Sequence, residues 1–171
     1  MRFETREITS IQFTDLVNTC RKNMHGLVDT VEKTLSQVND TEQTELQHAS
    51  ALYSHAIEEY AHLMLLDTIN INNGMADLTP IEHKYFRHEE KFPMVFNELG
   101  QQGKTARKAP FDDNIFDSGI FDAKDTEISW DLRLRIFNTE VDSSGKPKLV
   151  PMISKNDLAQ AVSTLKSARL Y

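Results

Sequence analysis

The sequence predicts a mainly α protein, an antiparallel helix bundle of about four main helices with a short β-hairpin before the last helix. Apolar residues recur at three- and four-residue spacing over long stretches, which is typical of helices that bury one face. Helix-start signals precede several of these stretches, and one short segment alternates apolar and polar residues as a strand does. The length of 171 residues, with 39% hydrophobic and 26% charged residues, fits one domain spanning 1–171.

The first two predicted helices cover residues 13–38 and 41–70. The apolar face of the first consists of Phe13, Leu16, Val17, Cys20, Met24, Leu27, Val28, Val31, Leu35 and Val38. Asp40 with Gln43 resembles a capping box, in which two side chains bind free backbone N–H groups where a helix starts. The core stripe of the second helix consists of Leu46, Ala49, Tyr53, Ala56, Ile57, Tyr60 and Met64.

The third predicted helix begins at residues 79–82. Residues 72–74 (Asn-Asn-Gly) end the second helix in this prediction, and residues 79–82 (Thr-Pro-Ile-Glu) combine an N-cap threonine, a first-turn proline and a glutamate. Pro93 lies inside the third helix and lacks a backbone donor. We therefore expect a kink or a break there.

The region 100–129 has no sustained period and is predicted to be a long loop. A β-hairpin is predicted over 130–150. Residues 130–137 alternate apolar and charged side chains, and residues 143–145 (Ser-Ser-Gly) supply the turn.

The last predicted helix starts after Ser154, which pairs with Asp157 as a second capping box. The apolar residues expected to pack this helix on the bundle are Leu158, Ala161, Val162, Leu165 and Ala168.

Charge and cysteine content narrow the function classes. The net charge of −7 argues against a surface that holds nucleic acid mainly by neutralising phosphates. The apolar run at 63–66 is too short to span a bilayer and the N-terminus has no apolar signal core, so we expect no membrane partner and a cytoplasmic location. Cys20 is the single cysteine, and its helical spacing favours a packed thiol over a nucleophile.

A stripe of histidines on the second helix carries the first candidate chemistry. His48, His55 and His62 are seven residues apart, and Glu59 lies between the last two on the same face at the edge of the core. His55, Glu59 and His62 could bind zinc, iron or manganese. The alternative is that these side chains are solvated or pair with one another.

The third helix carries a second group of polar residues. A different mononuclear metal site could be formed there by His83, His88 and Glu89. His88 and Lys91 are one helical turn apart, and an imidazole beside a cation can act as a general base or hold a phosphate. A charged surface turn explains this pattern equally well.

Three segments together resemble the AbiV-type abortive-infection proteins of the HEPN superfamily. They are residues 49–62 (ASALYSHAIEEYAH), residues 86–91 (FRHEEK) and residues 135–142 (RIFNTEVD) with the later Pro151, and their order along the chain also matches. The resemblance implies a HEPN-like helix bundle, a role in prokaryotic phage defence and, as in many superfamily members, a homodimer with an RNA-cleaving cleft. The resemblance also implies that RNA cleavage needs no cofactor.

Carried over by position, the resemblance implies a site formed by Glu59, His88 and Lys91. Glu59 matches the second acid of the family's Glu-Glu pair, and the other two match its His-x-x-Lys element. His88 as the base would take the ribose 2'-hydroxyl proton, and the Lys91 cation would stabilise the charged phosphorane. The Glu59 carboxylate would orient the base.

Two departures from the family pattern support other functions. The chain has Tyr60, Ala61 and His62 where the family commonly has Gly-Lys, and His88 lacks the superfamily's arginine four to six residues upstream. Three hypotheses therefore follow: a HEPN-like defence protein acting on RNA or on the translation machinery, a non-catalytic helical module that binds a phage or host protein, and a metal-dependent enzyme using the histidine stripe.

Overall fold

The computed structural model describes residues 2–101 and 153–168. This part of the chain is mainly α-helical with a small antiparallel sheet, which confirms the predicted class. In chain order the elements are β1 (Glu7–Thr9), α1 (Ser10–Gln37), α2 (Gln43–Asp67), β2 (Ile71–Asn72), β3 (Met75–Asp77), η1 (Thr79–Ile81), α3 (Glu82–Tyr85), α4 (His88–Gln101) and α6 (Lys155–Lys166).

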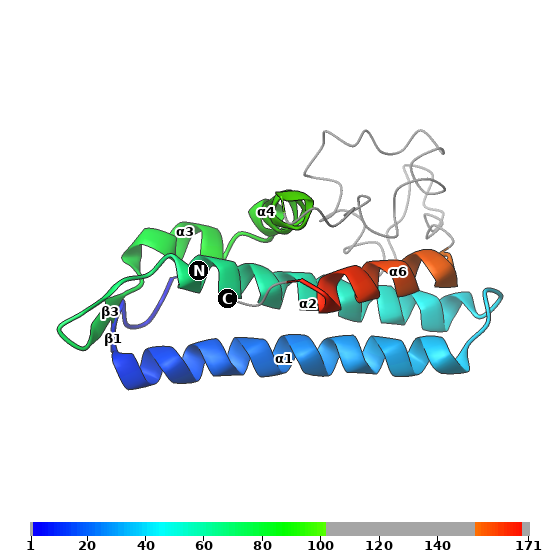
Figure 1. Cartoon of the computed structure of the whole chain (residues 1–171), viewed down its shortest axis with the longest axis horizontal. Coiled ribbons are helices and arrows are strands. Elements are labelled where there is room, and N and C mark those ends of the chain that lie inside the picture. The colour runs from blue at the N-terminus through cyan, green and yellow to red at the C-terminus, as the bar shows by residue number, and fades with distance from the viewer. Residues whose placement is uncertain (1, 102–152, 169–171) are drawn as a thin grey trace, which may run out of the picture.

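The two long helices α1 and α2 form the antiparallel centre of the fold (Figure 1). Helix α2 also contacts α3, α4 and α6, so it has neighbours on several sides. This explains why buried residues extend around most of α2, including polar Ser50, Ser54 and Glu58. The predicted single stripe on this helix is therefore only part of its buried surface.

Helix α1 buries the predicted stripe, with Cys20, Met24, Val28, Val31 and Leu35 inside the core. It starts at Ser10, three residues earlier than predicted. A capping box sets this start: the side chains of Thr9 and Gln12 each accept a hydrogen bond from the backbone N–H of the other, at 3.2 and 2.9 Å.

The capping box predicted at Asp40 and Gln43 is wrong. Helix α2 begins at Gln43, and its N-cap residue, Glu42, makes no capping bond with its side chain. Asp40 Oδ1 instead accepts from the backbone N–H of Lys155 at 2.8 Å. The Gln43 amide accepts from Ile153 N at 2.8 Å and donates to Ile153 O at 3.1 Å. Both side chains therefore secure the start of α6.

The segment after α2, predicted only as the end of a helix, is a β-hairpin. Helix α2 stops at Asp67, and strands β2 and β3 pair through a two-residue turn of Asn73 and Gly74, with φ of 50° and 78°. These left-handed conformations suit Asn-Gly in a tight hairpin. Strand β1 pairs with β3 on its other edge, which gives the order β1-β3-β2.

The helical segment that starts near residue 79 is divided at Phe86 and Arg87, and Pro93 does not break it. Helix α4 continues through Pro93 to Gln101. Aromatic rings pack at this break: the ring of Phe3 lies 5.0 Å from that of Tyr85 and 4.9 Å from that of Phe86, measured between centroids.

The predicted cap at residues 79–82 is also corrected. The side chain of Thr79 does not cap; its backbone N–H donates to Asp77 Oδ1 at 2.9 Å. Glu82 accepts instead from the backbone N–H of Phe3 at 3.0 Å and from the Arg6 guanidinium at 2.9 Å. The N-terminal segment is thereby attached to α3.

Helix α6 confirms the prediction for the last helix. The Ser154 side chain accepts from Asp157 N at 3.3 Å, and the predicted packing residues are buried: Leu158, Ala161, Val162, Leu165 and Ala168. The predicted hairpin at 130–150 and most of the predicted loop at 100–129 lie outside the described residues.

Candidate functional site

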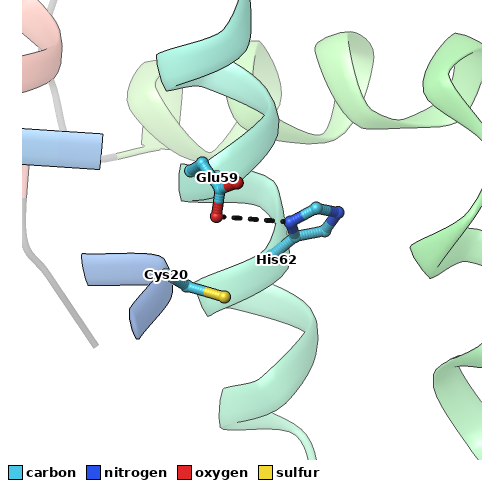
Figure 2. Close-up of side chains that lie close together, drawn as sticks. All are labelled: Cys20, Glu59 and His62. Carbon is cyan, nitrogen blue, oxygen red and sulfur yellow. Dashed lines mark ion pairs between the residues drawn. The ribbon is translucent and has the colours of Figure 1, made fainter. Parts of the chain in front are cut away.

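Five polar side chains from four helices meet beside the centre of the bundle, and we call them the His62 cluster. Cys20 comes from α1, Glu59 and His62 from α2, Tyr85 from α3 and Lys91 from α4. Figure 2 shows the first three, with the thiol and the carboxylate pointing toward the same side of the imidazole.

Local helix geometry explains how α2 and α4 contribute to the cluster. Glu59 and His62 are three residues apart and therefore lie on one face of α2. Lys91 shares the buried face of α4 with Phe92, Val95 and Leu99, and it is only 2% exposed. The apolar face of α4 thus brings a lysine head group against α2.

The shortest contact in the cluster joins Lys91 Nζ to His62 Nε2 at 2.6 Å. The carbonyl oxygen of Tyr85 lies 3.3 Å from the same ring nitrogen. An ammonium group can only donate, so a charged Lys91 requires Nε2 to accept. The ring proton then sits on Nδ1.

Glu59 faces that second nitrogen of His62. Its Oε2 lies 3.5 Å from Nδ1, and among the described atoms the buried Nδ1 has no hydrogen-bond partner. This distance is too long for a well-formed hydrogen bond, and the contact is an ion pair only when both ring nitrogens carry protons. Burial raises the pKa of Glu59, but His62, Cys20 and Lys91 together outweigh burial and hold this pKa below its usual value.

Tyr85 covers the imidazole and reaches the thiol. Its ring stacks on that of His62 with centroids 4.0 Å apart and an angle of 11° between the planes, and its hydroxyl lies 3.9 Å from Cys20 Sγ. Lys91 Nζ lies 5.7 Å from the centre of the same ring, within range of a cation–π contact. Burial, and secondly the nearby Glu59 charge, raise the pKa of Cys20 to about 11, as expected of a packed thiol.

Two of the three residues predicted for catalysis meet in this cluster. Glu59 and Lys91 come together because α2 and α4 pack against each other, and the charge of Lys91 acts on the Glu59 carboxyl. His88 is the first residue of α4, and its side chain lies outside the described part of the structure. The imidazole between acid and cation is that of His62.

The predicted metal set of His55, Glu59 and His62 is only partly assembled. His55 Nδ1 lies 3.8 Å from Glu58 Oε2 instead. Within the described ranges, the ligand group whose donor atoms lie within 4.8 Å of one another consists of Cys20, Glu59 and His62.

The other metal alternative involved His83, which is exposed on α3 and contacts Glu90 at 3.6 Å. The side chains of its predicted partners, His88 and Glu89, lie outside the described residues.

Sequence reasoning missed Cys20 and Tyr85 as members of the site. Cys20 lies on the apolar stripe of α1, where a ligand and a core thiol look the same. Tyr85 lies in the short helix that precedes the break at Phe86 and Arg87. A signal for His62 was present, since it lies one turn after Glu59 on the histidine stripe.

No family model, curated protein or solved structure matches this chain. None of the helices within the described ranges is long and apolar enough to cross a membrane.

Proposed function

We propose that this chain is a HEPN-like phage-defence protein that acts on RNA or on the translation machinery, and that it is a ribonuclease that needs no metal cofactor. The proposal joins the resemblance to AbiV-type proteins with one structural observation. A buried lysine and a carboxylate lie on opposite nitrogens of one imidazole, with Lys91 Nζ 2.6 Å from His62 Nε2 and Glu59 3.5 Å from His62 Nδ1.

This arrangement supplies the three roles that RNA transesterification needs. The Lys91 ammonium can only donate, so its contact with Nε2 places the ring proton of His62 on Nδ1, on the side of the Glu59 carboxylate 3.5 Å away. Nε2 is then the basic nitrogen. A substrate phosphate attracts the Lys91 ammonium away from Nε2 and is neutralised by it. The freed Nε2 then takes the proton of the ribose 2'-hydroxyl.

The bonds and protons of the reaction balance without another reactant. The 2'-oxygen loses its proton to His62, forms a bond to phosphorus and displaces the 5'-oxygen of the next nucleotide. The leaving oxygen needs a proton. The resemblance implied that His88, one turn before Lys91 on α4, is the base; because His62 takes that role in this proposal, we assign the proton donor to His88 instead. The products are a 2',3'-cyclic phosphate and a 5'-hydroxyl.

Purified protein incubated with RNA in the presence of a chelator tests this function. We expect cleavage that leaves 2',3'-cyclic phosphate ends, and a loss of about 10²- to 10⁴-fold in rate for His62→Asn, as is typical when a general base is removed. Lys91→Met and Glu59→Gln should also slow cleavage. The matched control is His48→Asn, on the same stripe of α2 and two heptads before His62.

Two results would contradict the proposal. Intact RNA after incubation with the wild-type protein at high concentration would remove the nuclease function, and equal rates for wild type and His62→Asn would remove the site. His88→Ala, expressed beside wild type with growth and RNA integrity followed, tests the role of His88. Toxicity and RNA loss that persist in that variant would exclude His88 from catalysis.

The burial of Lys91 favours a second candidate function, a helical module that binds a phage or host protein without chemistry of its own. At 2% exposure the Lys91 head group is shielded from a substrate unless α4 or its neighbours move. A non-catalytic role also fits the net charge of −7. In that case His62→Asn would lower the free energy of unfolding, and RNA would stay intact with the wild type and with every variant.

A further inference from the structure

We infer that Cys20, Glu59 and His62 form a binding site for a zinc-class divalent cation. This inference does not rest on RNA cleavage, although it uses Glu59 and His62 of the same cluster. It differs from the metal set suggested by the sequence because Cys20 of α1 takes the place of His55. The three residues come from two helices and offer three different donor atoms: a thiol sulfur, a carboxylate oxygen and an imidazole nitrogen.

The spacing of the donors fits tetrahedral zinc. Zinc binds nitrogen and oxygen at about 2.0–2.2 Å, so two such ligands at the tetrahedral angle lie about 3.4 Å apart. Glu59 Oε2 and His62 Nδ1 are 3.5 Å apart. All three donors lie within 4.8 Å of one another, so small side-chain movements bring the sulfur to the longer zinc–sulfur distance of about 2.3 Å.

The state of His62 Nδ1 independently points to a ligand. This atom is buried, and among the described atoms it has no hydrogen-bond partner, although buried ring nitrogens normally have one. Its nearest acid sits at a ligand-to-ligand distance instead of a hydrogen-bond distance. A cation placed between the three donors would satisfy both Nδ1 and the carboxylate.

The surroundings of the ring supply the second partner that metal-binding histidines need. A histidine that binds metal through one nitrogen usually donates its other N–H to a carbonyl or carboxylate. The backbone carbonyl oxygen of Tyr85 lies 3.3 Å from Nε2 and can accept that proton. The contact between Lys91 Nζ and His62 Nε2 must then break, because both of these nitrogens would carry hydrogens and neither could accept.

The donor set selects the metal class. One thiolate, one imidazole and one carboxylate suit zinc, whereas magnesium, calcium and manganese prefer oxygen ligands alone. Thiolate and carboxylate together supply two negative charges, which match a divalent cation. Three protein ligands also leave a fourth tetrahedral position for water or another small ligand.

Cobalt titration of the full chain, stripped of metal and kept reduced, tests the site. We expect one equivalent of Co²⁺ to bind, with the intense visible bands of tetrahedral cobalt and a near-ultraviolet thiolate-to-cobalt charge-transfer band. Zinc should abolish these bands by displacement. Cys20→Ser should remove the charge-transfer band, and Glu59→Gln should weaken binding by roughly 100-fold or more, since even outer-shell partners are worth about 10- to 100-fold.

The controls make every outcome decisive. His48→Asn should bind cobalt as the wild type does, and Glu59→Gln preserves the side-chain shape if Cys20→Ser fails to fold. The inference is overturned if the wild type shows no charge-transfer band, if the band survives in Cys20→Ser, or if binding is equal in Glu59→Gln. The optical readout needs no RNA, so a failed metal site and a failed nuclease are told apart.

Discussion

The contact between His62 and Lys91 can be tested by a double-mutant cycle on stability. Lys91→Met removes the ammonium but keeps an unbranched chain of similar length in the buried face of α4. His62→Phe removes the ring nitrogens but keeps a ring that can stack on Tyr85, where the centroids are now 4.0 Å apart. The cycle then isolates the contact from the other interactions of each residue.

The expected size of the coupling follows from the geometry. The donor and acceptor are 2.6 Å apart, one of them is charged, and Lys91 is 2% exposed. A hydrogen bond to a charged group contributes about 1.5–3 kcal/mol, and burial protects this one from competition by water. We therefore expect the two substitutions to couple by about 2 kcal/mol, favouring the wild-type pair.

Urea unfolding of the wild type, both single variants and the double variant measures this coupling. If the free energy of unfolding falls by about 2 kcal/mol per molar urea, a coupling of about 2 kcal/mol corresponds to a shift of about 1 M in the unfolding midpoint. The matched control is the pair Lys166 and Glu32, which has a similar distance of 2.7 Å but is solvent-exposed. There we expect no resolvable coupling. A His62–Lys91 coupling below about 0.5 kcal/mol would show that this contact is not made in solution, and the proposed catalytic arrangement would fall with it.

Other parts of the structure give further predictions. Gly74→Ala should lower the free energy of unfolding by about 1–2 kcal/mol, measured with urea, because residue 74 has a φ of 78°. Gly26→Ala lies in the exposed middle of α1, where an added Cβ has nothing within 4 Å, and should stabilise the protein by about 0.5–1 kcal/mol. Equal effects of the two substitutions would contradict the hairpin geometry. Burial raises the pKa of Cys20 to about 11, so at pH 8 the metal-free folded protein should hold about a hundredfold less thiolate than an ordinary thiol of pKa 9.0 and be alkylated correspondingly slowly. Urea should restore the alkylation rate, and fast alkylation of the folded protein would contradict the packing. Desolvation opposes ionisation of Glu82, but the contact with Arg6 outweighs it and lowers the pKa of Glu82. This contact therefore stabilises the fold above the ordinary glutamate pKa, and the stabilisation is lost as pH falls through the lowered pKa. Glu82→Gln should reduce that acid sensitivity, measured by unfolding at several pH values.

Regular burial made part of the fold predictable. The stripe of α1 and the packing face of α6 are periodic because each helix turns one face to the core, and a local pattern records this directly. The capping side chains were read correctly at Ser154 but not at Asp40 or Gln43. Those two bond to residues more than a hundred positions away, and no local rule contains that information.

The hairpin at Asn73 and Gly74 shows a different limit. The Asn-Gly pair was visible, but its strands are only two and three residues long and are stabilised by β1 from the N-terminus. Strands this short carry no recognisable period. The pair was therefore read only as the end of a helix.

The candidate site was predictable to the extent that it lies along single helices. Glu59 and His62 share a face of α2, and Lys91 was singled out on α4. Which residue of α1 faces them depends on how α1 and α2 align, and Cys20 could not be distinguished from its apolar neighbours by spacing alone. The polar cluster is a product of helix packing.

The two proposals meet in the ring of His62 and predict how each would affect the other. As a base, His62 needs a free Nε2 and a proton on Nδ1 toward Glu59. As a metal ligand through Nδ1, it carries its proton on Nε2, toward the Tyr85 carbonyl, and cannot accept another. One imidazole cannot do both at once. If both proposals hold, zinc bound beside Cys20 inhibits RNA cleavage and a chelator restores it, whereas cleavage that requires zinc would exclude the metal-independent mechanism and leave Glu59 and His62 as metal ligands.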